Sequence, residues 1–299
     1  MSQIGYSKPD KMCAAVLFQT GQRLKILDLE IPDLFFGQVL VKILFSGVCR
    51  SQVMEVSGGR GEDPWLPHLL GHEGSGVVIA VGKGVTKVTL GDEVILGWIK
   101  GEGHDTHGAH YKNGEQVINS GRVTTFSNYS VVSESRVTKK PRELPFDEAV
   151  LFGCALPTGA GMALNQIQPT VHSSVIVLGL GGIGLSALMT LSALKVEKII
   201  AVDLAEEKLD MAKTLGATHV FNAGTQNIVK LIENISDGGA DYCIESAGAT
   251  STIELGFSLI KQGSGQLIFA SHPPDGETIR LVPHDLIRGK KIIGSWGGA

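Results

Sequence analysis

Residues 179–184 spell Gly-Leu-Gly-Gly-Ile-Gly, with glycines spaced as in a phosphate-binding turn. The segment follows a β-branched run at residues 175–178 and precedes an uncharged stretch of helix formers that ends near Leu194. In such a strand–turn–helix unit the first glycine permits a tight turn, the second lets a pyrophosphate approach the backbone, and the third lets the helix pack on the strand. Unpaired N–H groups at the helix start then attract phosphate. The pattern predicts a dinucleotide site.

An acidic residue closes the next predicted strand. Asp203 ends the segment KIIAVD at residues 198–203 and lies 19 residues after Gly184. An acidic residue at about this distance binds the hydroxyls of a dinucleotide ribose. Because a carboxylate repels a 2′-phosphate, the sequence predicts NAD rather than NADP. The alternative is that Asp203 only caps the helix that follows it.

These two features lie in the second of two differently patterned halves. Up to about residue 140 the chain predicts mostly short strands, at residues 13–18, 24–32, 38–48, 74–82 and 124–140. Residues 98–122 are polar and glycine-rich, which predicts a long surface loop.

From about residue 145 strands alternate with helices, which indicates βαβ units and a parallel sheet. The segment 146–164 predicts helices broken near Pro157. We therefore expect an α/β protein with one domain over residues 1–155 and a second over residues 156–299.

Composition narrows the class of protein. Of the 299 residues 43% are hydrophobic and 19% charged, which is enough apolar side chain for a large core. The net charge is −4 and basic residues are scattered, so no nucleic-acid surface is expected. The amino-terminal segment has no apolar signal core, and four cysteines without a C-x-x-C pair do not indicate a disulfide framework. These features favour the reducing cytoplasm.

The 22 residues from 173 to 194 carry no charge and are long enough to span a bilayer. A buried core of an α/β domain gives similar runs, however. The order of β-branched residues, glycines and helix formers favours a strand, a turn and a helix, so no membrane segment is expected.

Cys49, His72 and Cys154 are candidate metal ligands, although their spacing alone carries little weight. A buried cysteine is more often a small apolar residue than a ligand. Their surroundings are more specific. Residues 47–51 (GVCRS), 71–74 (GHEG), 91–94 (GDEV) and 153–154 (GC) stand in the same order as in the medium-chain zinc alcohol dehydrogenases. The chain resembles this family over nearly its whole length.

The resemblance implies a GroES-like, β-barrel-type catalytic domain followed by a doubly wound, parallel-sheet Rossmann domain. It implies that Cys49, His72 and Cys154 hold one catalytic zinc per chain, with a fourth position open for an alcohol. Zinc would act as a Lewis acid, and the alcohol would release hydride to NAD.

Two further catalytic residues follow from the same resemblance. Ser51 corresponds to the hydroxyl that accepts the alcohol proton, and Glu73 to a carboxylate behind the zinc that approaches it as a ligand in some relatives. Two neighbours depart from the family. Gln52 replaces an aspartate that orients the zinc histidine, and Met54 replaces a histidine that ends the proton relay. A thioether cannot carry a proton, so the relay beyond Ser51 would need water or a ribose hydroxyl.

Other matching positions would contact the cofactor. Thr158 and Ile183 resemble residues that pack on the nicotinamide, Arg50 a pyrophosphate contact and Lys208 an adenosine-ribose contact. Arg50 and Lys208 could equally be solvated surface charges. The predicted cofactor site is therefore made of Arg50, Thr158, Gly179, Gly181, Gly182, Ile183, Gly184, Asp203 and Lys208.

The family's structural zinc lobe has no counterpart here, because the loop near residues 101–118 contains no cysteine. His104, His107 and His110 lie there instead, and we expect them to be solvent-exposed. The family's chain normally returns after its last Rossmann strand to complete the β domain. The sequence stops at Ala299, so we expect those elements to be missing from it.

The leading hypothesis is an oxidoreductase that transfers hydride between an alcohol or polyol, or its aldehyde or ketone, and NAD at a catalytic zinc. A zinc-free enoyl or quinone reductase is one alternative, and a dinucleotide-binding protein without catalysis is another. The expected partner is a small alcohol or carbonyl compound. The resemblance also implies a homodimer or homotetramer. Trp65 and Trp98 are candidates to line the substrate pocket.

Overall fold

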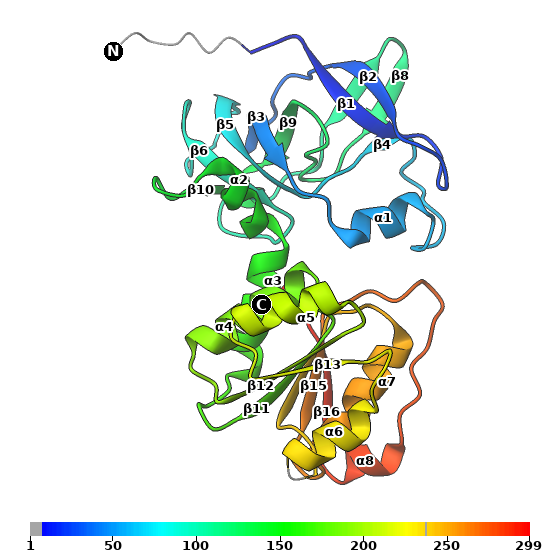
Figure 1. The fold of residues 1–299 in the computed structure, drawn as a ribbon. Helices are drawn as coiled ribbons and strands as arrows, with labels where there is room; N and C mark the ends of the chain where they lie inside the picture. The colour runs from blue at the N-terminus through cyan, green and yellow to red at the C-terminus, as the bar shows by residue number, and fades with distance from the viewer. Residues whose placement is uncertain (1–7, 237) are drawn as a thin grey trace. The chain divides into compact units, whose positions relative to one another are not determined.

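The computed structural model describes residues 8–236 and 238–299, so the first seven residues of the polar amino-terminal segment lie outside it. The chain divides into two compact units, Met1–Cys154 and Ala155–Ala299. The first unit is rich in strands and the second alternates strands with helices (Figure 1).

The first unit contains a closed barrel and a five-stranded sheet. The barrel has the order β1 (Lys11–Leu17), β2 (Lys25–Glu30), β7 (His110–Asn113), β8 (Gln116–Asn119) and β4 (His68–Leu69). The sheet has the order β10 (Val137–Lys139), β6 (Glu93–Gly97), β5 (Glu73–Val81), β3 (Gln38–Ser46) and β9 (Tyr129–Ser133). Alternate residues of β1, namely Met12, Ala14 and Val16, enter the barrel core, as the period of two along a strand requires. The predicted β-barrel-type fold is confirmed.

The prediction of a long structureless loop at residues 98–122 is wrong, because β7 and β8 form a hairpin within it. The two-residue turn is Gly114-Glu115, and Gly114 has a φ of +59°, which glycine adopts at little cost. Tyr111 and Ile118 face each other across the hairpin and are fully buried. A glycine at the first of the two turn positions is the signal for this hairpin that the sequence contains.

The helical region from residue 146 breaks at Cys154 and not near Pro157. The helix α2 (Phe146–Ala149) and a 3-10 turn (Val150–Gly153) precede Cys154, whose φ of −150° is not helical. Pro157 is the third residue of α3 (Ala155–Gly161). Proline is tolerated in the first turn of a helix because its missing N–H has no partner there. A short π-helical segment, Met162–Ile167, continues α3.

The second unit is built on a six-stranded parallel sheet. Its spatial order is β13 (His219–Asn222), β12 (Lys198–Asp203), β11 (Ser174–Leu178), β14 (Tyr242–Glu245), β15 (Gln266–Phe269) and β16 (Lys291–Gly294). In chain order this is 3-2-1-4-5-6, the order of the Rossmann fold. The topology reverses between β11 and β14, where such sheets bind ligands at the carboxyl ends of the strands. The predicted doubly wound sheet is confirmed.

Helices cover both faces of this sheet (Figure 1). On one face α4 (Gly182–Ala193) and α5 (Glu206–Thr214) pack, and on the other α6 (Ile228–Ile235) and α7 (Thr250–Leu259). Val175 and Val177 of β11 enter the first core, whereas Ile176 and Leu178 enter the second. Both sides of the strand are therefore buried, which explains its continuous apolar run. A short helix, α8 (Pro283–Ile287), precedes β16.

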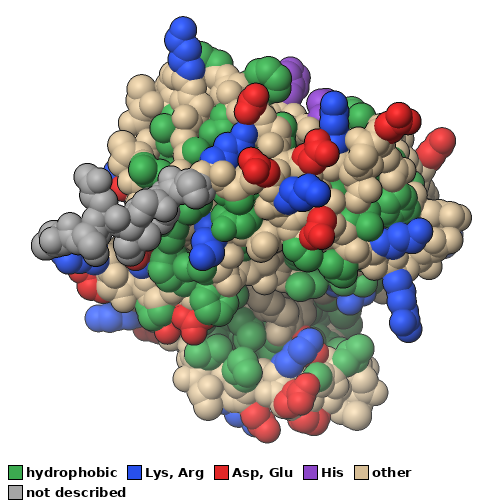
Figure 2. Space-filling model, turned by 90° about the horizontal axis from the view of Figure 1, so that it is seen from above, with side chains coloured by type: hydrophobic (Ala, Val, Ile, Leu, Met, Phe, Trp, Pro, Cys, Tyr) green, Lys and Arg blue, Asp and Glu red, His purple; other side chains and the backbone are tan. Residues whose placement is uncertain are grey.

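No single helix among the described residues is long and apolar enough to cross a membrane. One bent pair of short helices, Phe146–Gly153 and Ala155–Ile167, has the length and the apolar composition for it. Figure 2 shows lysine and arginine side chains interspersed with aspartate and glutamate on the face that is drawn, in keeping with the scattered charges of the sequence.

Candidate active site

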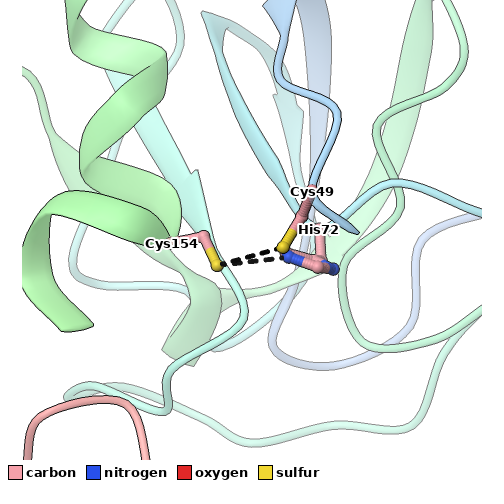
Figure 3. Close-up of side chains that lie close together, drawn as sticks. All are labelled: Cys49, His72 and Cys154. Atoms are coloured by element: carbon pink, nitrogen blue, oxygen red, sulfur yellow. Dashed lines mark hydrogen bonds between the residues drawn. The ribbon is translucent and has the colours of Figure 1, made fainter. Parts of the chain in front are cut away.

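The first unit brings Cys49, His72 and Cys154 together from three segments (Figure 3). Cys49 immediately precedes α1 (Arg50–Val56), His72 lies between β4 and β5, and Cys154 follows the 3-10 turn after α2. His72 Nε2 lies 3.3 Å from Cys154 Sγ, and the two Sγ atoms lie 3.9 Å apart. Positions separated by up to 105 residues thus converge on one point.

This donor set fits zinc. Two thiolates and one imidazole are ligands that zinc prefers, and three protein ligands leave a fourth position open. A tetrahedral zinc with ordinary bond lengths separates two sulfur ligands by about 3.8 Å, and a nitrogen from a sulfur by about 3.6 Å. The observed 3.9 and 3.3 Å are close to both values.

Hydrogen bonds around the two cysteines favour the ligand form of Cys49. A hydrogen bond from Cys154 lowers the pKa of Cys49 to about 3, against the opposing effect of burial. The side chain and backbone of Ser51 also donate to Cys49. The pKa of Cys154 is raised. The largest cause is its hydrogen bond to Cys49, and the second is burial. The indole of Trp98 donates to Cys154, a role that the sequence analysis did not assign to this tryptophan.

Glu73 is buried against Gly47 and Gly153, each of which lies within two residues of a candidate ligand cysteine in the chain. A Cβ built on Gly47 would lie 2.6 Å from Glu73 Cδ, and one on Gly153 would lie 2.6 Å from Glu73 Cβ. These glycines, next to the segments that carry the cysteines, therefore leave the space that the Glu73 side chain fills. Burial raises the pKa of Glu73 to about 7, and its Oε2 has no hydrogen-bond partner among the described residues. An unpaired buried carboxylate oxygen suits a place near a cation.

Replacement of Gly47 by alanine tests this packing. We expect Gly47→Ala to displace the Glu73 carboxylate, to lower stability by about 1–3 kcal/mol, as overpacking does, and to reduce activity. Gly121→Ala is the matched control, because its Cβ would meet its nearest atom at 3.5 Å. Thermal unfolding and activity of both variants are the measurements. Equal effects from both would contradict the arrangement.

Gln52 and Met54, which replace the aspartate and the histidine of the family, each contact other groups in this structure. Gln52 Oε1 accepts from the backbone N–H of Gly71, and its Nε2 donates to Glu55 at 3.0 Å. The aspartate that Gln52 replaces orients the zinc histidine in the family, whereas in the structure Gln52 binds the backbone one residue before His72. Met54 packs against Gly59, where a Cβ would lie 2.7 Å from Met54 Cγ.

The glycine turn of the second unit has the geometry of a dinucleotide cradle. Gly179 has a φ of +85°. A Cβ on Gly184 would lie 1.9 Å from the carbonyl oxygen of Gly179, so only glycine allows α4 to start this close to β11. A Cβ on Gly181 would meet no described atom within 4 Å. Protein packing therefore does not require glycine there, whereas the approach of a ligand does.

Asp203 supports this turn. Its Oδ2 accepts from Leu180 N at 2.7 Å, and its Oδ1 accepts from Leu204 N at 2.8 Å and Ala205 N at 3.0 Å. Burial opposes ionisation, but these backbone donors hold the pKa of Asp203 below its ordinary value. Lys208 Nζ lies 3.8 Å from the carboxylate. Asp203 thus carries the negative charge expected near the ribose. Its hydrogen bond to Leu180 N also fixes the backbone of the glycine turn.

The other predicted cofactor residues are spread over both units. Thr158 is buried in α3, and Ile183 is half-buried in the first turn of α4. Arg50 is exposed at the first position of α1 in the first unit. We therefore treat the contacts of these three residues with a cofactor as proposals.

Known proteins match both units. Residues 36–142 match the alcohol dehydrogenase GroES-like domain, and residues 182–299 match the zinc-binding dehydrogenase family. The S-(hydroxymethyl)glutathione dehydrogenase of Paracoccus denitrificans is 31% identical over 320 residues, covering 96% of this chain and 85% of the relative. This chain belongs to the medium-chain zinc alcohol dehydrogenases.

Two further relatives belong to the same family. The class-3 alcohol dehydrogenase of Cereibacter sphaeroides is 30% identical, again over 96% of this chain and 85% of the relative. The crystal structure of benzyl alcohol dehydrogenase from Acinetobacter calcoaceticus superposes with a TM-score of 0.86 at 31% identity, covering 96% of this chain and 84% of that one. The predicted family and its oxidoreductase class are thus confirmed, as are zinc and a nicotinamide dinucleotide as the kinds of cofactor the family uses.

The loop histidines of this dehydrogenase have separate environments. All three are exposed. The ring of His104 packs edge-on against Phe36 at 4.7 Å, while His110 Nδ1 lies 3.0 Å from Asn119 Oδ1. In a second group that could bind metal, Glu55, Asp63 and His68, the histidine Nε2 is hydrogen-bonded to Asp63 Oδ2 at 2.8 Å.

We therefore expect about one zinc per chain. Metal analysis of protein purified without a histidine tag or added zinc is the measurement. The double variant His104→Ala, His107→Ala should keep the same content. Close to two zinc ions in the parent, with a fall to one in the double variant, would show instead that the loop binds metal.

Proposed function

We propose that this dehydrogenase transfers hydride between an alcohol or polyol, or the corresponding aldehyde or ketone, and NAD. The observation that carries the proposal is the convergence of Cys49, His72 and Cys154 at separations that suit a zinc with an open fourth position. Residues 1–155 would form the catalytic domain and residues 156–299 the dinucleotide domain. Glu73 would lie behind the metal, as its buried, unpaired oxygen supports.

Ser51 is the proposed acceptor of the alcohol proton. Zinc, when bound, supplies a Lewis acid that makes an alcohol easier to deprotonate. Ser51 can accept that proton only as it gives up its own, so its hydroxyl, which donates to Cys49 Sγ in the structure, would have to turn to another acceptor. Met54 cannot pass that proton on, so water or a ribose hydroxyl must receive it.

The cofactor proposed is NAD. The Asp203 carboxylate is held ionised by backbone donors and stands at the end of β12, where it favours ribose hydroxyls over a 2′-phosphate. Gly179, Gly181, Gly182 and Gly184 would admit the pyrophosphate, with Arg50 and Lys208 as further contacts. Thr158 and Ile183 would pack on the nicotinamide.

The test combines zinc content with the change in NADH absorbance over a substrate panel. The panel should include S-(hydroxymethyl)glutathione and benzyl alcohol, which the names of two relatives specify, together with 2,3-butanediol and other polyols. Zinc-dependent reduction of NAD by an alcohol is the expected result. NADPH oxidation by an enoyl compound or quinone without zinc would favour a reductase, and dinucleotide binding without any turnover would favour a protein without catalysis.

Assembly and location are part of the proposal. We propose a homodimer or homotetramer, as the family resemblance implies, and a cytoplasmic protein. The four cysteines, Cys13, Cys49, Cys154 and Cys243, are all free thiols in the structure, which supports a reducing compartment. Light scattering of the purified protein measures the assembly.

A further inference from the structure

Glu245 is a fully buried carboxylate at the carboxyl end of β14, one of the two strands that flank the reversal of the sheet. Its Oε1 accepts from Ala247 N and Gly248 N, both at 2.9 Å, and from Thr252 Oγ1 at 2.7 Å. Its Oε2 accepts from Ser271 Oγ, which follows β15. One side chain thus joins the loop after β14, the first turn of α7 and the loop after β15.

All of these partners of Glu245 are uncharged hydrogen-bond donors. No ion pair of Glu245 occurs among the residues that the structure describes. The donors instead include the backbone just before α7, whose positive dipole end favours an anion. The N-cap position is occupied by Ala249, which has no side-chain oxygen. Glu245 therefore binds the loop before α7 and the hydroxyl of Thr252 in its first turn, and not the backbone N–H groups of the helix itself.

The loop that Glu245 holds lies against the glycine turn. Ser246 N donates to Leu178 O at 2.8 Å, and Ser246 Oγ donates to Gly179 O at 2.8 Å. A Cβ on Gly179 would lie 2.7 Å from Ala247 N, so the two loops are in close contact. Any movement of residues 246–248 would therefore displace the first glycine of the dinucleotide cradle.

We propose that Glu245 is a positioning residue of the dinucleotide site. By fixing residues 246–248 it keeps the glycine turn in the shape that receives the pyrophosphate, although it need not touch the cofactor itself. This inference rests on the proposed function, since it assumes that the second unit binds NAD.

The variant Glu245→Gln tests it in the whole chain. The amide nitrogen can only donate, so it cannot replace Oε1, which accepts from Ala247, Gly248 and Thr252. In place of Oε2 it keeps a partner only if the Ser271 hydroxyl turns round to accept, so the bond that Ser271 donates is lost or reversed. We expect the Kd for NADH, followed by its fluorescence, to rise about tenfold. The KM for NAD should rise similarly, whereas kcat at saturating NAD and the KM for the alcohol should stay near the parent values. Ser271→Ala, which removes one donor, should have a smaller effect in the same direction.

Asp241→Asn is the matched control. Asp241 precedes the same strand at its opposite end and accepts from Ser174 N at 2.7 Å and Lys261 Nζ at 2.7 Å. It should lower thermal stability but leave the Kd for NADH unchanged. Equal Kd values for Glu245→Gln and the parent would overturn the proposal, and so would an equal rise in both variants. If Glu245→Gln does not fold, an unchanged Kd in Ser271→Ala overturns it. A parent protein that binds no NADH would instead refute the proposed function.

Discussion

Replacing Cys154 with serine is expected to remove bound zinc and catalysis together. A neutral hydroxyl is a poor ligand for zinc compared with a thiolate. With only Cys49 and His72 left beside Glu73, the site has no spare partner of equal strength. Loss of a residue one step outside a metal site already costs about 10–100-fold, so loss of a ligand should reduce kcat/KM by more than about 100-fold. Metal analysis and NADH absorbance measure the two effects.

The control for this variant is Cys243→Ala. Cys243 is also buried, but it lies in the core on one face of the parallel sheet in the second unit. Its replacement leaves a small cavity and should lower stability while the zinc content stays the same. A Cys154→Ser protein that keeps the zinc and the rate of the parent would refute the ligand assignment.

The sequence predicted the second unit better than the first because its signals are local. The glycine turn, Asp203 and the strand between them all fall within a stretch of 25 residues, 179–203. Further along the second unit, β13 and α6 were not predicted individually. The strand β13 has four residues, of which only Val220 and Phe221 are apolar, so it gives no continuous apolar run. The helix α6 is amphipathic, and Asn227 caps it by accepting from Lys230 N at 3.2 Å, a signal that the sequence does contain.

The metal site could not be derived from spacing. Cys49 and Cys154 are separated by most of the first unit, and only the folded sheet brings their sulfur atoms to 3.9 Å. The family resemblance supplied the pairing instead. Neither source indicated that Trp98 donates to Cys154, or that the Gln52 amide would bind the backbone of Gly71. Such contacts depend on side-chain packing between distant segments, which a motif does not encode.

The last expected result concerns cofactor choice. The parent protein should prefer NAD over NADP, and Asp203→Asn should narrow that preference by at least about tenfold, because it removes the charge that repels the 2′-phosphate. The asparagine oxygen can still accept from Leu180 N, so the glycine turn should keep its shape. The amide nitrogen then takes the place of Oδ1 and loses the bonds from Leu204 N and Ala205 N. Asp203→Ala loses this acceptor as well. It should therefore weaken binding of both dinucleotides, in addition to narrowing the preference.

Comparing Asp203→Asn with Asp203→Ala separates the effect of the negative charge from the effect of the hydrogen bond to the glycine turn. Glu207→Gln is the matched control, since it removes one negative charge from the exposed first turn of α5 without a bond to the glycine turn. Its ratio of kcat/KM for NAD to that for NADP should equal that of the parent. Titration of each protein with NADH and NADPH gives the affinities, and steady-state rates give the ratio. A parent protein that already prefers NADP would overturn the role of Asp203 in cofactor choice. Equal NADH affinities in Asp203→Asn and Asp203→Ala would show that its bond to Leu180 contributes nothing to the site.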